Sequence, residues 1–213
     1  GYRNPALLVK MMTTLDLISN GRAILGIGGG LLRTEYLAYG FGRPDDYPDS
    51  ISRLTRLREV IQVAKLMWRE PYSNFQGEQL NLNDARLDPK PIQNPRPRIL
   101  VGGGGEKVTL RIVAEEADMA NFFVAGPSAF AGKYEILKSH CGVVGRAIDE
   151  IEITALERLT LADTTQKAED KWKGRNLRME SKYKGLIGNP DEVVSQIQEY
   201  REKGAATIFL MVP

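Results

Sequence analysis

The sequence is poor in the residues that bind metals and form disulfides. The chain of 213 residues has one cysteine, Cys141, and one histidine, His140. A single cysteine excludes an internal disulfide and fits the reducing cytosol, so we expect a cytoplasmic protein. Because there is no cluster of cysteines and histidines, a zinc site is excluded on ligand count, and we expect no metal. His140 lies at the end of a predicted helix, where a histidine usually interacts with the helix C-terminus.

Net charge and long hydrophobic runs are also lacking. Lys and Arg number 29 against 27 Asp and Glu, which gives a formal net charge of +2. These charges are interspersed, so no basic face is predicted for nucleic acid or for an acidic membrane. No apolar run approaches the ~20 residues of a membrane span, and the first residues do not resemble a signal peptide. With 42% hydrophobic and 26% charged residues, the composition is that of an ordinary globular domain.

Glycine is plentiful, yet the familiar nucleotide-binding motifs are missing. A G-x-G-x-x-G pattern that starts at Gly26 needs a glycine where Leu31 stands, and one that starts at Gly28 needs it at Arg33. No Gly-Lys-Ser/Thr triplet is present, which excludes a P-loop. No G-x-S-x-G is present either, so a nucleophile elbow is not predicted.

What the chain does have is two glycine clusters, Gly26–Gly30 and Gly102–Gly105. Each follows a short apolar run, over 23–25 and 98–101, that predicts a buried strand. Glycine at the carboxyl end of a strand lets a ligand approach bare backbone amides. Two such ends in one α/β chain suggest a single ligand held by two neighbouring strands. The alternative, for each cluster, is that the glycines only form a tight turn.

The second cluster also precedes a predicted helix that begins at Glu106. The unpaired amides of a helix N-terminus and the helix dipole together favour an anion. In barrels, phosphate often binds to a strand-to-helix loop of this kind. We therefore expect Gly102–Gly105 to hold a phosphate.

Strands and helices alternate along the sequence. We expect helices over 5–18, 49–68, 106–116, 127–140, 163–180 and 189–203, a small hairpin over 75–82, and strands over 22–27, 98–101, 117–124, 151–156 and 207–212. Such alternation predicts a parallel sheet with crossover helices. The chain opens on Gly1 and runs almost at once into a helix, so we expect an upstream part to be missing. The prediction is an α/β fold: one incomplete TIM (β/α)8-type barrel domain over 1–213, with about five of its eight parallel strands.

Polar residues close to the predicted strand ends have both a functional and a structural interpretation. Glu35 could act as a base, but an acid at the start of a helical turn is the commoner case, so it is only a weak catalytic candidate. Arg33 beside it could pair with an anionic ligand or could be a solvated charge. Asn121, at the end of the third strand, is a candidate ligand contact. Asp118, at the beginning of that strand, is expected to tie down a neighbouring loop.

Several blocks of the sequence resemble the luciferase-like monooxygenases and their flavin- and deazaflavin-dependent relatives. They are RNPALLVK at 3–10, TLDLISNGR at 14–22, the first glycine cluster followed by Glu35-Tyr36 and Gly40, PKPIQ at 89–93, ILVGGGGEK at 99–107 with ADMAN at 117–121, and GNPDEV at 188–193. Most are weak individually, but together they are specific, and they cover most of the chain.

The resemblance implies a (β/α)8 barrel with the cofactor at its C-terminal face. The spacing of VGGGGEK and A-D-x-x-N is most similar to the branch that transfers a hydride to or from coenzyme F420. The alternatives are a monooxygenase that uses reduced FMN and a non-catalytic, degenerate flavin-binding barrel. A sugar-phosphate isomerase would use a phosphate loop equally well, but it needs convergent acid and base groups that the clusters lack. Leu31, where dehydrogenases of sugar phosphates carry an acid, argues against that substrate.

The resemblance also implies partners and contacts. We expect a small-molecule substrate and a homodimer, and the barrel strands that the family has before this region would lie upstream of Gly1. The expected cofactor contacts are Gly26, Gly28, Gly30, Val101, Gly102, Gly103, Gly104, Gly105 and Asn121.

Overall fold

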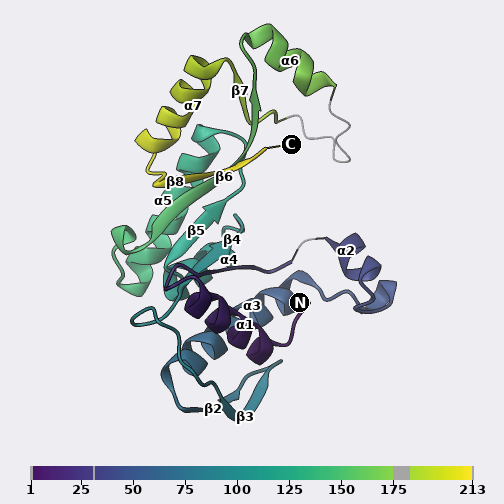
Figure 1. Ribbon diagram of the computed structural model, residues 1–213, viewed down its shortest axis with the longest axis vertical. Helices are drawn as coiled ribbons and strands as arrows, with labels where there is room; N and C mark the ends of the chain where they lie inside the picture. The colour runs from purple at the N-terminus through teal and green to yellow at the C-terminus, as the bar shows by residue number, and fades with distance from the viewer. Residues whose placement is uncertain (1, 31, 175–182, 213) are drawn as a thin grey trace. The chain divides into compact units, whose positions relative to one another are not determined.

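The structure is a computed structural model that describes residues 2–30, 32–174 and 183–212 (Figure 1). The chain divides into two compact units. Unit 1 comprises Gly1–Gly102 with Glu116–Asp118, and unit 2 comprises Gly103–Glu115 with Met119–Pro213. Each unit is described by itself below.

The sheet of unit 1 places the two glycine clusters side by side. Strand β1 (Ile24–Gly28) pairs in parallel with β4 (Arg98–Gly102). The register runs from Ile24 opposite Arg98 to Gly28 opposite Gly102. The expectation that the clusters end two neighbouring strands is therefore confirmed.

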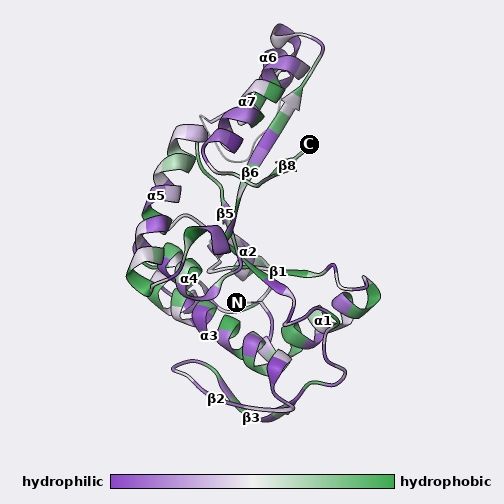
Figure 2. Cartoon of the chain, turned by 90° about the vertical axis from the view of Figure 1, so that its left-hand side faces the viewer, coloured by the Kyte–Doolittle hydropathy of each residue, from purple (hydrophilic) through white to green (hydrophobic). Residues whose placement is uncertain are grey.

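Helices α1 (Pro5–Ile18) and α3 (Ser50–Arg69) pack together in unit 1. Asn4 and Asp49 cap them, because each side chain accepts a hydrogen bond from a first-turn amide, at 3.1 Å and 2.7 Å. Figure 2 shows hydrophilic and hydrophobic residues alternating around the turns of α3. Its apolar side is buried, and the Trp68 indole donates to the Thr13 hydroxyl of α1 at 3.1 Å. Between β1 and α3 lie the short helix α2 (Arg33–Ala38) and the 3-10 turn η1 (Pro44–Asp46).

A hairpin follows α3, formed by β2 (Tyr72–Gln76) and β3 (Asn81–Arg86). The buried carboxylate of Glu59 accepts hydrogen bonds from the amides of Glu78 at 2.6 Å, Gln79 at 3.1 Å and Leu80 at 2.9 Å. A Cβ on Gly77 would lie 2.5 Å from the Glu59 carboxyl carbon. The turn of the hairpin is thus built around one carboxylate of α3.

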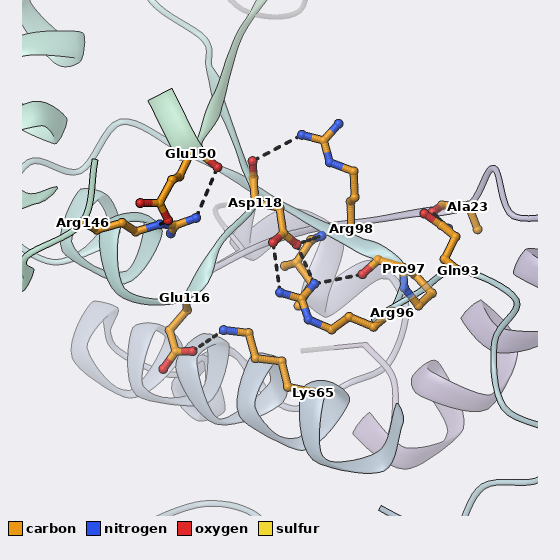
Figure 3. A network of polar contacts seen from close by, with 11 residues as sticks. Ala23, Lys65, Gln93, Arg96, Pro97, Arg98, Glu116, Asp118, Arg146 and Glu150 are labelled. Carbon is orange, nitrogen blue, oxygen red and sulfur yellow. Dashed lines mark hydrogen bonds and ion pairs between the residues drawn. The ribbon is translucent and has the colours of Figure 1, made fainter. Parts of the chain in front are cut away.

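Asp118 fixes the chain just before β4, as the sequence predicts. Its carboxylate accepts two hydrogen bonds from the Arg96 guanidinium, at 2.5 Å and 3.0 Å (Figure 3). It also accepts one from the Ile99 amide at 2.7 Å. The segment that leads into the second glycine cluster is therefore held by a bidentate ion pair.

Strand β6 (Glu152–Leu161) is the centre of unit 2. Among the described residues, three strands pair with β6, all of them in parallel. Strand β5 (Met119–Phe122) pairs with the first residues of β6, and β8 (Thr207–Met211) pairs with Thr154–Arg158. Strand β7 (Leu186–Gly188) pairs with Leu159–Leu161. The remaining helices are α4 (Thr109–Glu116), α5 (Pro127–Val144), α6 (Thr165–Lys173) and α7 (Pro190–Glu202), with a 3-10 turn η2 (Ile148–Glu150). The core of the unit includes the rings of Phe122, Phe130 and Tyr200, with centroids 5.5 Å and 5.6 Å apart along the series.

Several local predictions need correction, among them the bounds of the strand expected over 151–156, which is Glu152–Leu161, and of the hairpin expected over 75–82, which is Tyr72–Gln76 with Asn81–Arg86. The helix expected from Glu106 begins at Thr109, because residues 106–108 form a turn. Strand β7 was missed, since Leu186–Gly188 is too short to show a period. The charged helix expected over 163–180 is α6, which ends at Lys173, and positions 175–182 lie outside the described residues. That all of 1–213 forms one domain stays a prediction.

Candidate functional site

A pocket of about 190 Å³ lies at the carboxyl end of β1 in unit 1. Gly28, Gly29 and Gly30 form part of its wall. The rest is mostly aromatic or apolar and includes Tyr2, Ile27, Tyr36, Tyr47, Leu57 and Val60. Gly26 is exposed on β1 and does not line this pocket. The first glycine cluster therefore borders a space of the kind that takes small molecules.

Two of these glycines have a backbone reason to be glycine. A Cβ on Gly28 would lie 3.1 Å from the carbonyl oxygen of Gly102, and Gly30 has φ +71°. The first is a close approach of two strands, and the second is a left-handed conformation that side chains disfavour. The tight-turn interpretation thus holds for Gly30, whereas strand packing accounts for Gly28, and the open pocket beside them is additional to both.

Two arginines of α3 contact this pocket in different ways. Arg53 donates to the carbonyls of Gly30 at 3.1 Å and Pro48 at 2.6 Å, and lies 4.8 Å from the centroid of the Tyr47 ring. Its charge thus holds the pocket wall together. Arg56, one turn later, is half-buried, and within the described part of the chain it has no hydrogen-bond or ion-pair partner.

Arg56 also lines a second pocket of unit 1, of about 370 Å³, which follows the hairpin. Its wall combines apolar residues with four amide side chains, those of Asn4, Gln79, Asn81 and Asn83. Gln79 and Arg56 line both pockets, so the two spaces adjoin at these side chains.

Glu35, the weak catalytic candidate, lies in the first turn of α2 and does not line either pocket. Its carboxylate accepts a hydrogen bond from the Tyr2 hydroxyl at 3.2 Å. Burial, and then the nearby Glu35 carboxylate, raise the pKa of Tyr2 above its usual value. The geometry favours the structural interpretation of Glu35. Arg33 opens the same helix with an exposed side chain.

The second glycine cluster continues into unit 2 as a loop of bare amides. The Gly103 amide donates to the backbone carbonyl of Asn121 at 3.1 Å. The amides of Gly104, Gly105 and Glu106 have no acceptor among the residues that the structure describes. A Cβ on Gly105 would come within 2.8 Å of the Thr109 hydroxyl, so a larger residue would require the Thr109 side chain to move.

Lys133 of α5 supplies positive charge at this loop. A Cβ on Gly104 would lie 3.4 Å from its Cε. The ammonium group forms an ion pair with the Glu106 carboxylate at 2.7 Å, and this hydrogen bond and its charge lower the pKa of Glu106. His140 Nε2 is 2.7 Å from the carbonyl oxygen of Glu106. His140 thus contacts the turn before α4 rather than the end of its own helix. Free amides with a nearby ammonium form a suitable anion site.

The other predicted contacts differ in accessibility. Asn121 is half-buried, and its side-chain amide donates to the Thr154 hydroxyl of β6 at 2.8 Å. Val101 is fully buried, so its side chain belongs to the core. Leu31 lies outside the described residues. No three His, Cys, Asp or Glu side chains gather as a metal site in the described ranges.

Sequence reasoning missed Arg53, Arg56 and Lys133. A signal for two of them exists, because Arg53, Arg56 and Glu59 recur every three residues along one predicted helix. Glu59 holds the hairpin turn, Arg53 holds the loop carbonyls, and Arg56 is left at the pockets between them. Lys133 is distant in sequence from the loop, so only the fold brings it there.

The sequence model described as luciferase-like monooxygenase matches residues 1–184. The chain belongs to the luciferase-like monooxygenase family. The resemblance inferred from the sequence blocks is thereby confirmed. Every helix of the described residues is too short or too polar to span a membrane.

Relatives of this luciferase-like chain include two kinds of oxidoreductase. It is 30% identical over 175 residues to the pyrimidine monooxygenase RutA of Acinetobacter baylyi. This match covers 81% of the chain and 45% of the relative. It is 41% identical over 106 residues to the F420-dependent glucose-6-phosphate dehydrogenase of Kineococcus radiotolerans. This match covers 50% of the chain and 29% of the relative. The chain thus spans less than half the length of these curated relatives.

Solved structures confirm the fold of the luciferase-like chain. The F420-dependent tetrahydromethanopterin reductase of Methanopyrus kandleri matches 99% of the chain with a TM-score of 0.81 and 21% identity, and 74% of that structure is covered. An F420-dependent secondary alcohol dehydrogenase, in complex with an F420–acetone adduct, matches 99% with a TM-score of 0.82 and 18% identity, over 70% of its own length. The predicted α/β fold of TIM-barrel type is confirmed, and the matched part is incomplete with respect to both structures.

Proposed function

We propose that the protein is an F420-dependent oxidoreductase that transfers a hydride between a small-molecule substrate and the deazaflavin. The observation that carries this proposal is the loop Gly103–Gly105, where the Gly104 and Gly105 amides have no acceptor among the described residues and lie near Lys133, a suitable cradle for a phosphate. F420 carries a phosphate in its tail, and the loop fits such a group because no Cβ fills it.

The chain's own residues would bind and orient the cofactor. The amides of Gly104 and Gly105 would donate to phosphate oxygens, and Lys133, which pairs with Glu106 in the structure, would add a positive charge beside them. Asn121, whose carbonyl fixes Gly103, positions this loop. Gly26, Gly28, Gly30, Val101 and Gly102 stay proposed backbone contacts at the strand ends. When bound, the deazaflavin supplies two-electron hydride chemistry at the C-terminal face of the strands.

We favour F420 over FMN as the cofactor because of the identities of the two relatives. The F420-dependent glucose-6-phosphate dehydrogenase is the more identical of the two relatives described above, although over the shorter region. The longer match to RutA supports the second candidate, a monooxygenase that uses reduced FMN. The position of Glu35 outside the pockets supports the third, a non-catalytic flavin-binding protein. A homodimer and a cytoplasmic location remain part of this proposal.

Fluorescence titration of the purified protein with F420 and, separately, with FMN tests the proposal. We expect saturable binding of F420 that is tighter than that of FMN. Tighter FMN binding, together with oxygen uptake in the presence of reduced FMN and a substrate, would favour the monooxygenase. The absence of binding of either cofactor would refute both enzymes.

A matched pair of variants tests the phosphate loop. Lys133→Gln should weaken F420 binding about tenfold, because a charge-assisted hydrogen bond to phosphate is lost. Lys138→Gln removes the same charge from an exposed position of the same helix and should leave binding unchanged. Equal effects of the two variants would show that only the overall charge of α5 matters.

A further inference from the structure

Arg56, a half-buried arginine of unit 1 without a partner among the described residues, points to a ligand. A half-buried guanidinium normally pairs with a carboxylate or with carbonyls, because an unpaired buried charge is unfavourable. Arg53, one turn away, obeys this rule through two carbonyls and an aromatic ring. Arg56 lines two adjoining pockets, and no such partner is found for it in the ranges that the structure describes.

A second unsatisfied group belongs to a residue of the same pocket wall. The hydroxyl of Tyr47 is buried, and within the described residues it has no hydrogen-bond partner. Buried hydroxyls are bonded in most structures, so an orphan of this kind requires an explanation. A phenol and a guanidinium are both hydrogen-bond donors toward an anion. A ligand with anionic oxygens would satisfy the two groups.

The rest of the wall indicates what else the ligand carries. Tyr2, Tyr36 and Leu57 make the glycine pocket aromatic and apolar, which suits a ring or a short hydrocarbon body. Beyond Arg56 the second pocket offers the amides of Gln79, Asn81 and Asn83. Glu59 fixes the backbone of Gln79, so this polar rim is held in place by the same helix that presents Arg56.

We propose that Arg56 binds the anionic group, a carboxylate or a phosphate, of a small molecule whose apolar body occupies the pocket beside Gly28–Gly30. That this molecule is the substrate rests on the proposed function, whereas the anion site itself does not. Arg56 is thereby the specificity-determining residue of this pocket, and Tyr47 is a second donor to the same group.

The test is a 1H–15N NMR titration of the protein with benzoate, with neutral benzamide of the same shape, and with inorganic phosphate. We expect benzoate to shift the amides of Gly28–Gly30 and Gln79 in a saturable way, and to bind about tenfold more tightly than benzamide. Benzoate should also bind more tightly than phosphate, because phosphate lacks the apolar body. Phosphate binding that equals benzoate binding would overturn the apolar part of the proposal. No saturable shift with either anion would overturn the site.

Variants assign the effect to Arg56. Arg56→Gln should abolish the preference for benzoate over benzamide, whereas Arg56→Lys should keep part of it. Arg58→Gln makes the same charge change on the same helix, outside both pockets, and should keep all of it. Equal losses in Arg56→Gln and Arg58→Gln would overturn the assignment.

Tyr47→Phe leaves the charges intact and should weaken benzoate binding a few-fold. The proposal can therefore be tested even if Arg56→Gln does not fold. Benzoate binding unchanged in Tyr47→Phe would remove Tyr47 from the site. Titration of F420 on the same samples separates the two proposals. Benzoate binding without F420 binding would refute the proposed function and leave the anion site in place.

Discussion

The two units bury carboxyl groups in opposite ways. In unit 1, Asp16, Glu59 and Asp118 accept hydrogen bonds from backbone amides, from an amide side chain or from a guanidinium. In unit 2, the fully buried Glu157 of β6 accepts a hydrogen bond from the Tyr200 hydroxyl, which lies 3.1 Å from the Tyr183 hydroxyl. For Asp16 and Asp118 these donors stabilise the charged form of the carboxyl and lower its pKa, whereas the surroundings of Glu157 favour the neutral form and raise its pKa.

The pKa directions follow from these donors. Burial alone would raise the pKa of Asp118, but hydrogen bonds from Arg96 and the Ile99 amide lower it below its usual value. Burial raises the pKa of Glu157, and the hydrogen bonds from Tyr200 and Tyr183 offset this only in part. Burial also raises the pKa of Tyr183 to about 12, so this phenol stays neutral near pH 7.

The largest effect is expected at Glu59, where one carboxylate satisfies three amides. Glu59→Gln places an NH2 group against these donors and should lower the free energy of unfolding of unit 1 by about 3 kcal/mol. Urea unfolding of a Trp172→Phe background, followed through Trp68 of α3, measures it. Glu70→Gln, at an exposed side chain, is the control and should change little. A small loss in Glu59→Gln would mean that water replaces the carboxylate.

Asp118→Asn should destabilise unit 1 by about 2 kcal/mol at pH 7, because charged hydrogen bonds to Arg96 are lost. The folded-state pKa of Asp118 is lowered, so its contribution is present above its ordinary pKa of about 4 and is lost as pH falls through the folded pKa. The difference from the native protein should therefore shrink in acid. Asp88→Asn, an exposed carboxylate, is the control, and a pH-independent difference would contradict the charged form.

Glu157→Gln tests the opposite sign in unit 2. The folded-state pKa of Glu157 is raised above its unfolded value. Its contribution to the stability of the folded state is therefore complete below the unfolded pKa of about 4.3 and is lost as pH rises through the folded-state pKa. Gln cannot ionise, so the free energy of unfolding of the variant should increase relative to that of the native protein as pH rises. Unfolding followed through Trp172 of α6, in a Trp68→Phe background, measures this. Glu199→Gln, exposed on α7, should show no such trend.

The smallest effect is expected from an exposed ion pair. Lys167 and Asp163 lie 3.2 Å apart, with side chains 66% and 88% exposed. Lys167→Gln should lower the free energy of unfolding by about 0.3 kcal/mol, and high salt should abolish this difference. A larger loss in the urea midpoint would show that exposed charges of unit 2 matter as much as its buried ones.

Much of the fold follows from the sequence because its signals are local. The cap Asn4 with Pro5 and the apolar period of α1 predict this helix with its observed bounds. The glycines after β1 and β4 mark strand ends, and parallel pairing then brings Gly28 opposite Gly102. By contrast, Leu186–Gly188 has no periodicity of its own, and only its pairing with β6 makes it a strand.

The candidate site is less predictable, because it depends on contacts between distant residues. The loop glycines are visible in the sequence, but Lys133 reaches them only through the packing of α5. Arg53 and Arg56 are both arginines of helix α3, and only tertiary contacts distinguish them: Arg53 is hydrogen-bonded, whereas Arg56 has no partner within the described residues. Sequence patterns thus identify where backbone is bare, and the fold determines which charges reach it.

The missing side chain at Gly77 has an evolutionary consequence. A Cβ there would lie 2.5 Å from the carboxyl group of Glu59, so the two positions share one volume. A residue larger than glycine at 77 requires the Glu59 carboxylate to move or the side chain at 59 to be shorter, and the turn amides then need another acceptor. Positions 59 and 77 are therefore expected to co-vary among homologues, and a double-mutant cycle between them should be strongly non-additive.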